Sequence, residues 1–187
     1  MQEKIELHRR MAERMYDSQV EAYKAGHVEN KCWTAEGEIH EPFELTLFSP
    51  KRGDWTVQVT GPESMDPNAE FNLYWFGIPD FGIVWYEVFP HEDGWICRMR
   101  YEGTAADGEK VVAHQVDFAT VDDKGRVVRL EWYVDQPQWN AVWAKASGRS
   151  VEEVAAKVAT LGGWDAFLAE VNAEKKAREA AAGQTAG

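Results

Sequence analysis

The sequence predicts an α+β domain followed by a helical extension. Three observations support this: helical spacing near the start, four strand-like segments between residues 83 and 135, and helical spacing again after residue 148. Helices followed by a run of consecutive strands are typical of α+β proteins. We therefore predict one domain over residues 1–147 and a C-terminal helical extension over residues 148–187, with a frayed tail.

The N-terminal part is predicted to be helical. Residues 4–27 have amphipathic spacing, and Gly26 is expected to end this helix. One face of the helix would carry Ile5, Ala12, Met15, Gln19 and Tyr23. A short second helix is expected over residues 28–34. Extended segments are expected over residues 38–48 and 54–59.

The central part reads as a series of antiparallel hairpins. Strands are predicted over residues 83–91, 94–103, 109–121 and 125–135, and the turns "EDG", "ADGE" and "DDKG" separate them. After these strands, Ser150 and Glu153 form a capping-box pattern that predicts the start of a further helix. The "GGW" segment would end that helix, and a final helix follows it.

Composition and charge limit the classes of partner. The chain has 187 residues, of which 12% are aromatic, and a net charge of −12. Without a basic stripe we expect no binding to nucleic acid, and the negative charge disfavours anionic membranes. Cys32 and Cys97 do not form a CxxC pattern, so neither a disulfide framework nor a zinc site is predicted. The charged start does not resemble a signal peptide, and we expect a soluble, cytoplasmic protein.

Several motifs occur in a characteristic order, namely "WTAEGEIHEPF", "GIPDF", "YEGT" and "DDKGRVVRLEWYVD". Taken together over residues 16–144, they resemble the nuclear-transport-factor-2-like (NTF2-like) superfamily, in particular its SnoaL-like and ketosteroid-isomerase-like branch. The resemblance implies a cone-shaped, curved antiparallel sheet wrapped by N-terminal helices around a pocket, and a homodimer. This fold hosts isomerases, dehydratases, cyclases, lyases, hydrolases and binding subunits, so it does not specify a reaction.

Two carboxylates are the first catalytic candidates. Glu41 directly precedes Pro42, where the resemblance implies a carboxylate base, and the proline favours extended geometry at Glu41. Asp117 interrupts the otherwise apolar strand "AHQVDFATV", and the resemblance implies a protonated aspartate there that stabilises an oxyanion. The alternatives are an exposed glutamate at a strand edge and a solvent-facing aspartate on a one-sided sheet.

The sequence departs from the isomerases in the first helix. They use a tyrosine where this chain has Gln19, and its Tyr16 and Tyr23 lie at other positions of the same helix. Steroid isomerisation itself is therefore not predicted.

Further catalytic candidates are Asp135, His40 and His114. Asp135 matches a catalytic position of SnoaL-like cyclases, and its alternative role is a cap before "QPQW". Either histidine could act as a base or as an orienting partner. Because neighbouring strand residues point to opposite faces, His40 and Glu41 should not both face the pocket, and neither should His114 and Asp117.

Aromatic and aliphatic side chains are candidates for the pocket wall, with packing in the core as the alternative. The resemblance places Leu130, Trp132 and Val134 on the pocket face of their strand. The other substrate-binding candidates are Tyr23, Tyr74, Trp75, Trp85 and Arg100. Arg98 and Arg100 could instead pair with glutamates across the strands. Five scattered histidines form no metal-ligand motif, so no metal site is predicted.

These residues together favour a cofactor-independent lyase, dehydratase or isomerase that uses acid–base catalysis. The substrate would be small, apolar and aromatic, and superfamily members that cleave lignin-derived aromatics with loss of formaldehyde provide an analogy. The alternatives are an aldol closure of the polyketide-cyclase kind, epoxide hydrolysis, and a non-catalytic binding or dimerisation module.

Overall fold

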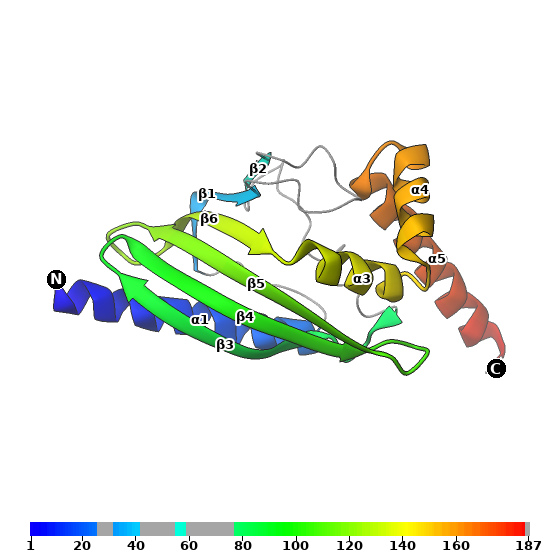
Figure 1. Ribbon diagram of the computed structural model, residues 1–187, viewed down its shortest axis with the longest axis horizontal. Coiled ribbons are helices and arrows are strands. Elements are labelled where there is room, and N and C mark those ends of the chain that lie inside the picture. The colour runs from blue at the N-terminus through cyan, green and yellow to red at the C-terminus, as the bar shows by residue number, and fades with distance from the viewer. Residues whose placement is uncertain (26–31, 42–54, 59–76, 186–187) are drawn as a thin grey trace.

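The computed structural model describes residues 1–25, 32–41, 55–58 and 77–185. It confirms the predicted α+β class, with an N-terminal helix, a central sheet and C-terminal helices (Figure 1). In chain order the elements are α1 (Gln2–Ala25), β1 (Trp33–Glu41), β2 (Trp55–Gln58), β3 (Gly82–His91), β4 (Gly94–Thr104), β5 (Lys110–Val121), β6 (Val127–Val134), α3 (Gln136–Ala146), α4 (Val151–Leu161) and α5 (Trp164–Thr185).

The six strands form one sheet in the order β2-β1-β6-β5-β4-β3. The strands from β3 to β6 pair as successive antiparallel hairpins, as predicted. However, β1 pairs with β6 in parallel, so the sheet is mixed rather than wholly antiparallel. Parallel pairing needs a long connection between the two strands, and here β2, β3, β4 and β5 lie between the partners in the chain.

β1 begins earlier than the sequence predicted. Trp33 and Thr34 were expected in a short helix, but they belong to the strand, where Trp33 pairs with Val127. Aromatic and β-branched residues suit strands, and pairing with β6 supplies the backbone partners that a short helix would lack. The predicted helix over residues 28–34 is therefore wrong at its C-terminal end, and residues 28–31 lie outside the described residues.

The sheet has a buried inner face and a more exposed outer face. Along β5 the burial alternates, so that Gln115, Asp117 and Ala119 are buried while His114 and Phe118 are exposed. Helix α1 packs on the inner face against β3 and β4, and Figure 1 shows it crossing behind these strands. The inner face therefore holds the core, and it is where a buried site can form.

A stripe of buried residues along α1 explains its packing. These residues occupy helical positions i, i+4, i+7 and i+8, which share one face. They are His8, Ala12, Met15 and Tyr16. The sequence predicted a related face but did not include Tyr16, whose hydroxyl donates to Asp117.

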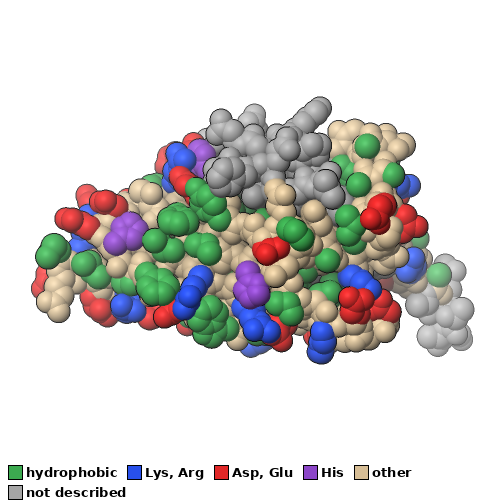
Figure 2. Space-filling view, viewed as in Figure 1, with side chains coloured by type: hydrophobic (Ala, Val, Ile, Leu, Met, Phe, Trp, Pro, Cys, Tyr) green, Lys and Arg blue, Asp and Glu red, His purple; other side chains and the backbone are tan. Residues whose placement is uncertain are grey.

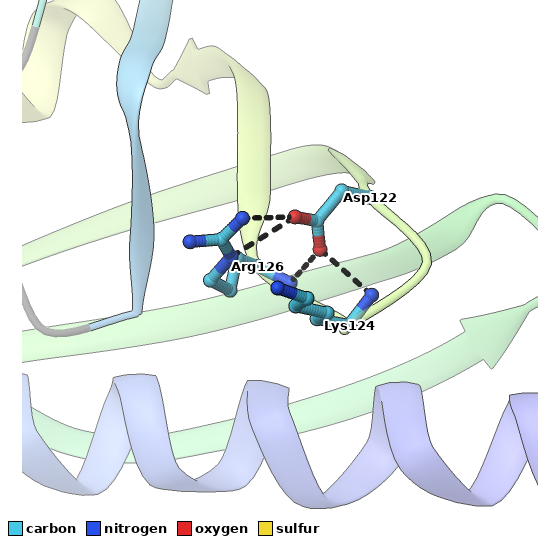
Figure 3. A network of polar contacts seen from close by, with 3 residues as sticks. All are labelled: Asp122, Lys124 and Arg126. Atoms are coloured by element: carbon cyan, nitrogen blue, oxygen red, sulfur yellow. Dashed lines mark hydrogen bonds and ion pairs between the residues drawn. The ribbon is translucent and has the colours of Figure 1, made fainter.

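The turn between β5 and β6 is held by Asp122 (Figure 3). Its carboxylate accepts hydrogen bonds from the backbone N–H groups of Lys124 and Arg126, at 2.9 Å each, and from the Arg126 guanidinium at 2.7 Å. Burial raises the pKa of Asp122, but these hydrogen bonds outweigh that effect and lower it. Gly125 has a φ of 75°, a conformation that favours glycine, and a Cβ there would lie 2.9 Å from Met11 Cγ. Both the backbone conformation and the lack of space therefore favour the predicted turn glycine.

The C-terminal helices extend the core beyond the sheet. Ser150 and Glu153 form the predicted capping box at the start of α4, and Gly162 ends that helix in the left-handed conformation. Val154 on α4 and Phe167 on α5 are fully buried in the same hydrophobic cluster as the sheet residues. The division into residues 1–147 and 148–187 stays a prediction, and it falls where α3 ends.

Candidate active site

Asp117 is a buried carboxyl group on the inner face of the sheet. Only 1% of its surface is exposed. Its Oδ2 accepts a hydrogen bond from the Tyr16 hydroxyl at 3.0 Å, and its Oδ1 accepts one from Gln115 Nε2 at 2.7 Å. Burial raises the pKa of Asp117 to about 7, although both hydrogen bonds act to lower it. Near neutral pH this carboxyl can therefore both donate and accept a proton.

Tyr16 connects the first helix to this carboxyl across 101 residues of sequence. Its oxygen also lies 3.4 Å from the indole nitrogen of Trp95, which donates to it. Burial and the nearby Asp117 raise the pKa of Tyr16 well above its ordinary value, so the hydroxyl keeps its hydrogen at neutral pH. The site thus contains a second neutral donor next to Asp117.

The residues paired with Asp117 on the neighbouring strands form a row across the sheet. Cys97 of β4 and Trp132 of β6 are its direct neighbours on the two adjacent strands. Burial, followed by the charge of Asp117, raises the pKa of Cys97, so this thiol does not act as a thiolate. His40 and Glu131 are the last pair of the β1–β6 register, and extending that register by one residue would place the backbone of Glu41 beside Trp132.

Glu41 and Asp117 therefore belong to one cross-strand row, with β6 between them. Two strand spacings of about 4.8 Å each separate their backbones by roughly 10 Å. The backbone of Glu41 ends β1, and its side chain lies outside the described residues. The predicted pairing of these two acids is thus consistent with the strand register, and the role of Glu41 stays a prediction.

Comparison with solved structures identifies the architecture. The chain matches a phenazine biosynthesis-related protein from Pseudomonas aeruginosa with 11% identity and a TM-score of 0.52, covering 76% of this chain and 88% of that one. It matches an NTF2-like protein of unknown function from Burkholderia pseudomallei with 14% identity and a TM-score of 0.51, covering 73% and 96%. AclR from Streptomyces galilaeus matches with 18% identity and a TM-score of 0.50, covering 72% and 87%. No protein-family model and no curated protein match the sequence.

The chain has an NTF2-like fold. The suspected superfamily resemblance is thereby confirmed at the level of the fold. Identities this low carry no information about the reaction, so the chemistry has to be argued from the side chains of this chain.

The NTF2-like sheet places three of the predicted wall residues on the face of Asp117. Leu130 is buried in the core, and Trp132 and Val134 pack against it from the same strand. Tyr23 packs edge-on against Phe81 and Tyr101, so it belongs to an aromatic cluster below β3 and β4. The candidates Tyr74 and Trp75 lie outside the described residues.

Trp85 and Arg100 are on the opposite face of the sheet from Asp117, and their binding of substrate stays a prediction. A bulge between Ile83 and Trp85 shifts the alternation of β3, so Trp85 pairs with Arg100 and is 45% exposed. The Arg98 guanidinium lies over the Trp85 ring at 5.1 Å. Arg100 forms an ion pair with Glu102 at 2.6 Å, in line with the structural alternative.

Both predicted histidines also lie away from Asp117. His114 faces the outer side and its Nδ1 lies 2.8 Å from Gln138 Oε1, as expected from its strand parity relative to Asp117. His40 pairs with the outward-facing Glu131, and its Nε2 lies 3.0 Å from Glu38 Oε2. Neither histidine therefore shares the face of Asp117, and the choice between the carboxylates and the histidines as catalytic groups stays a prediction.

Asp135 caps helix α3, which is the alternative role that the sequence offered, and its catalytic role stays a prediction. It is exposed at the end of β6, and its carboxylate accepts from the backbone N–H of Gln138 at 3.1 Å. This is the ordinary action of an aspartate N-cap, with Pro137 in the first turn of α3.

Sequence reasoning missed Tyr16, Trp95 and Gln115. Two simple signals could have revealed two of them. Tyr16 lies four residues after Ala12 on the apolar stripe of α1, and Gln115 lies two residues before Asp117 and hence on the same strand face. Trp95 has no comparable local signal, because its contact depends on how α1 lies across the sheet.

Two further properties concern the described part of the chain. Within it, no group of three or more His, Cys, Asp or Glu side chains has the arrangement of a metal site. None of its helices combines the length and apolar composition needed to cross a membrane.

Proposed function

We propose that this protein is a cofactor-independent isomerase or lyase in which Asp117 takes part in proton transfer. The observation that carries the proposal is the buried Asp117 carboxyl with a pKa of about 7 and a Tyr16 hydroxyl 3.0 Å from it. General acids and bases work best when their pKa lies near the working pH. A carboxyl poised in this way is uncommon outside functional sites.

The chemistry divides between two carboxyl groups. Neutral Asp117 is a hydrogen-bond donor that suits an oxygen on which negative charge develops, as in an enolate, and Tyr16 donates its own hydrogen to Asp117. Glu41 is proposed as the base that removes a proton from carbon, because its backbone lies in the same cross-strand row, roughly 10 Å away. A small substrate of one ring could span that separation.

The substrate is proposed to be apolar and aromatic. Leu130, Trp132 and Val134 share the face of Asp117, and aromatic rings pack favourably against such side chains. Two reactions can follow from this proton transfer. One is cleavage of a lignin-derived aromatic with loss of formaldehyde, and the other is elimination of water. An aldol closure of a polyketide-like chain would use the same two groups.

A ligand screen by thermal shift tests the proposal. Wild type and a Glu41→Gln, Asp117→Asn variant are compared against small aromatic and polyketide-like compounds. We expect at least one compound to raise the Tm of wild type and to raise that of the variant less, because at one ligand concentration a tighter ligand stabilises the folded state more. The matched control is a Glu131→Gln, Asp93→Asn variant, whose substitutions lie on the outer face and in an exposed turn.

The outcomes separate the alternatives. A compound that stabilises the control and wild type equally but not the site variant supports the proposed site. Equal stabilisation of all three proteins would place the ligand elsewhere and contradict it. No stabilisation by any compound of either class would contradict the proposed substrate class and favour a binding or assembly module.

We further propose that two copies associate through the outer face of the sheet. Three large apolar side chains are exposed there, Trp85 at 45%, Phe89 at 46% and Phe118 at 41%. Figure 2 displays hydrophobic side chains among charged ones on this side. The charges are internally paired, as in Arg98 with Glu87 and Arg129 with Glu131. A neutralised apolar face limits the repulsion between two copies of a chain with net charge −12.

Sedimentation velocity tests this association. Wild type is expected to sediment as a dimer, and a Phe89→Ser, Phe118→Ser variant as a monomer, because a stable interface needs about 800 Å² of each partner and these rings are central to the patch. An Ala177→Ser, Ala180→Ser variant on the exposed side of α5 serves as the control and should stay dimeric. A monomeric wild type, or a dimeric patch variant, would contradict the proposal.

A further inference from the structure

Four side chains form a continuous buried network, in which Trp95 donates to Tyr16, Tyr16 donates to Asp117, and Gln115 donates to the other oxygen of Asp117. We propose that Trp95 and Gln115 are positioning residues, which hold the Tyr16 hydroxyl and the Asp117 carboxyl in one hydrogen-bonded arrangement. This inference rests on the proposed function of Asp117. It adds two residues that touch no substrate in the proposal and that act through Asp117 and Tyr16.

Trp95 determines where the hydrogen of Tyr16 points. An indole N–H can only donate, so the Tyr16 oxygen is an acceptor in its 3.4 Å contact with Trp95 Nε1. The single hydroxyl hydrogen is then left for Asp117 Oδ2, 3.0 Å away. Trp95 is fully buried and fixed in the core, which prevents the hydroxyl from turning to another acceptor.

Gln115 secures the other end of the carboxyl. It lies two residues before Asp117 on β5, so both side chains face inward, and its Nε2 is 2.7 Å from Asp117 Oδ1. With one donor at each oxygen, the carboxyl plane is held at both ends. Each donor also favours the ionised form and opposes the effect of burial, so the network keeps Asp117 able to release its proton near neutral pH.

The expected consequence is measurable without any substrate. When Gln115 is replaced by methionine, Asp117 loses a donor that stabilises its ionised form, and its proton affinity should rise about tenfold, or roughly one pKa unit. Trp95→Phe replaces the indole by a smaller aromatic ring without an N–H, so Tyr16 becomes a weaker donor and the proton affinity of Asp117 should rise about threefold. The experiment is a pH titration followed by carboxyl 13C NMR of protein labelled at aspartate, with the Asp117 signal assigned by its absence in Asp117→Asn.

Matched controls separate positioning from general packing. Gln138→Met removes a side-chain amide from the outer face, and Trp139→Phe removes a buried indole N–H that donates to the His114 carbonyl. Neither residue contacts Asp117 through these bonds, and neither variant should change its titration. If Gln115→Met does not fold, Gln115→Asn shortens the side chain so that it no longer reaches Oδ1, and the same rise is expected.

The result distinguishes this inference from the proposed function. The positioning roles would be overturned if the pKa of Asp117 changed no more in the Gln115 and Trp95 variants than in the controls. That conclusion would hold even if Asp117 is catalytic. A shift of the expected size together with a failed ligand screen would support the network and contradict the proposed function. The NMR measurement thus stands independently of any activity assay.

Discussion

Replacing Asp117 with asparagine is expected to lower turnover roughly a hundredfold while leaving the fold intact, since a positioned acid or base contributes at least that much. Asparagine has the same shape, and its carbonyl can still accept from Tyr16. The Gln115 amide can rotate so that its carbonyl accepts from the new amide N–H. The variant therefore keeps the hydrogen-bond network and loses only the titrating proton. The measurement is kcat for a compound identified by the ligand screen.

The Asp93→Asn variant is the natural control for this substitution. It makes the same chemical change in an exposed turn of the β3–β4 hairpin and should keep the wild-type kcat. Circular dichroism at one pH would verify that both variants are folded. Full activity in Asp117→Asn would remove Asp117 from the chemistry and leave it a structural residue.

The stability of wild type is expected to fall relative to Asp117→Asn as the pH rises from about 4 to about 7. In the folded protein the pKa of Asp117 is about 7, compared with an ordinary value of 3.8. Between these values the folded state holds a proton that the unfolded state has released, so the slope of unfolding free energy with pH is negative. Over the whole window the loss amounts to about 4 kcal/mol.

Urea unfolding of both proteins at several pH values measures this effect. Because the two proteins differ at one titrating group, the contributions of the other carboxylates cancel in their difference. That difference should be constant below pH 4, should change steadily up to pH 7, and should then level off. Parallel curves over the whole range would mean that Asp117 ionises as easily when folded as when unfolded, which would contradict its burial as the dominant influence.

These two results concern the same physical fact. Ionising the Asp117 carboxyl in the folded state costs free energy, which lowers the stability at neutral pH. The carboxyl is nevertheless only 1% exposed. Such a cost is common where a group serves catalysis. If both predictions hold, the burial of the Asp117 carboxyl causes both the loss of stability and the activity.

Local chemistry made much of the fold predictable. The β5–β6 turn followed from "DDKG", in which Asp122 accepts from the residues after it and Gly125 takes a positive φ. The α4 capping box was likewise readable, because Ser150 and Glu153 are three residues apart. The inward direction of Asp117 was consistent with the apolar strand around it. In each case the interacting groups are close in sequence.

Long-range contacts were not predictable in the same way. The β3 bulge moved Trp85 to the outer face, and the parallel pairing of β1 with β6 set the row that relates Glu41 to Asp117. Gln19 was compared with a catalytic tyrosine, whereas Tyr16, one turn earlier, is the tyrosine that reaches the carboxyl. The capping contact of Asp135 likewise became visible only with the position of α3.

The sequence by itself determined the α+β class, the hairpins, the helix caps and the presence of an acid in an apolar strand, because periodicity and turn chemistry act over a few residues. Only the tertiary structure decided that Tyr16 donates to Asp117, that Trp95 and Gln115 complete the network, and that His114 and Trp85 lie outside it. The position of α1 across the sheet governs these contacts, and that position depends on the packing of the whole core.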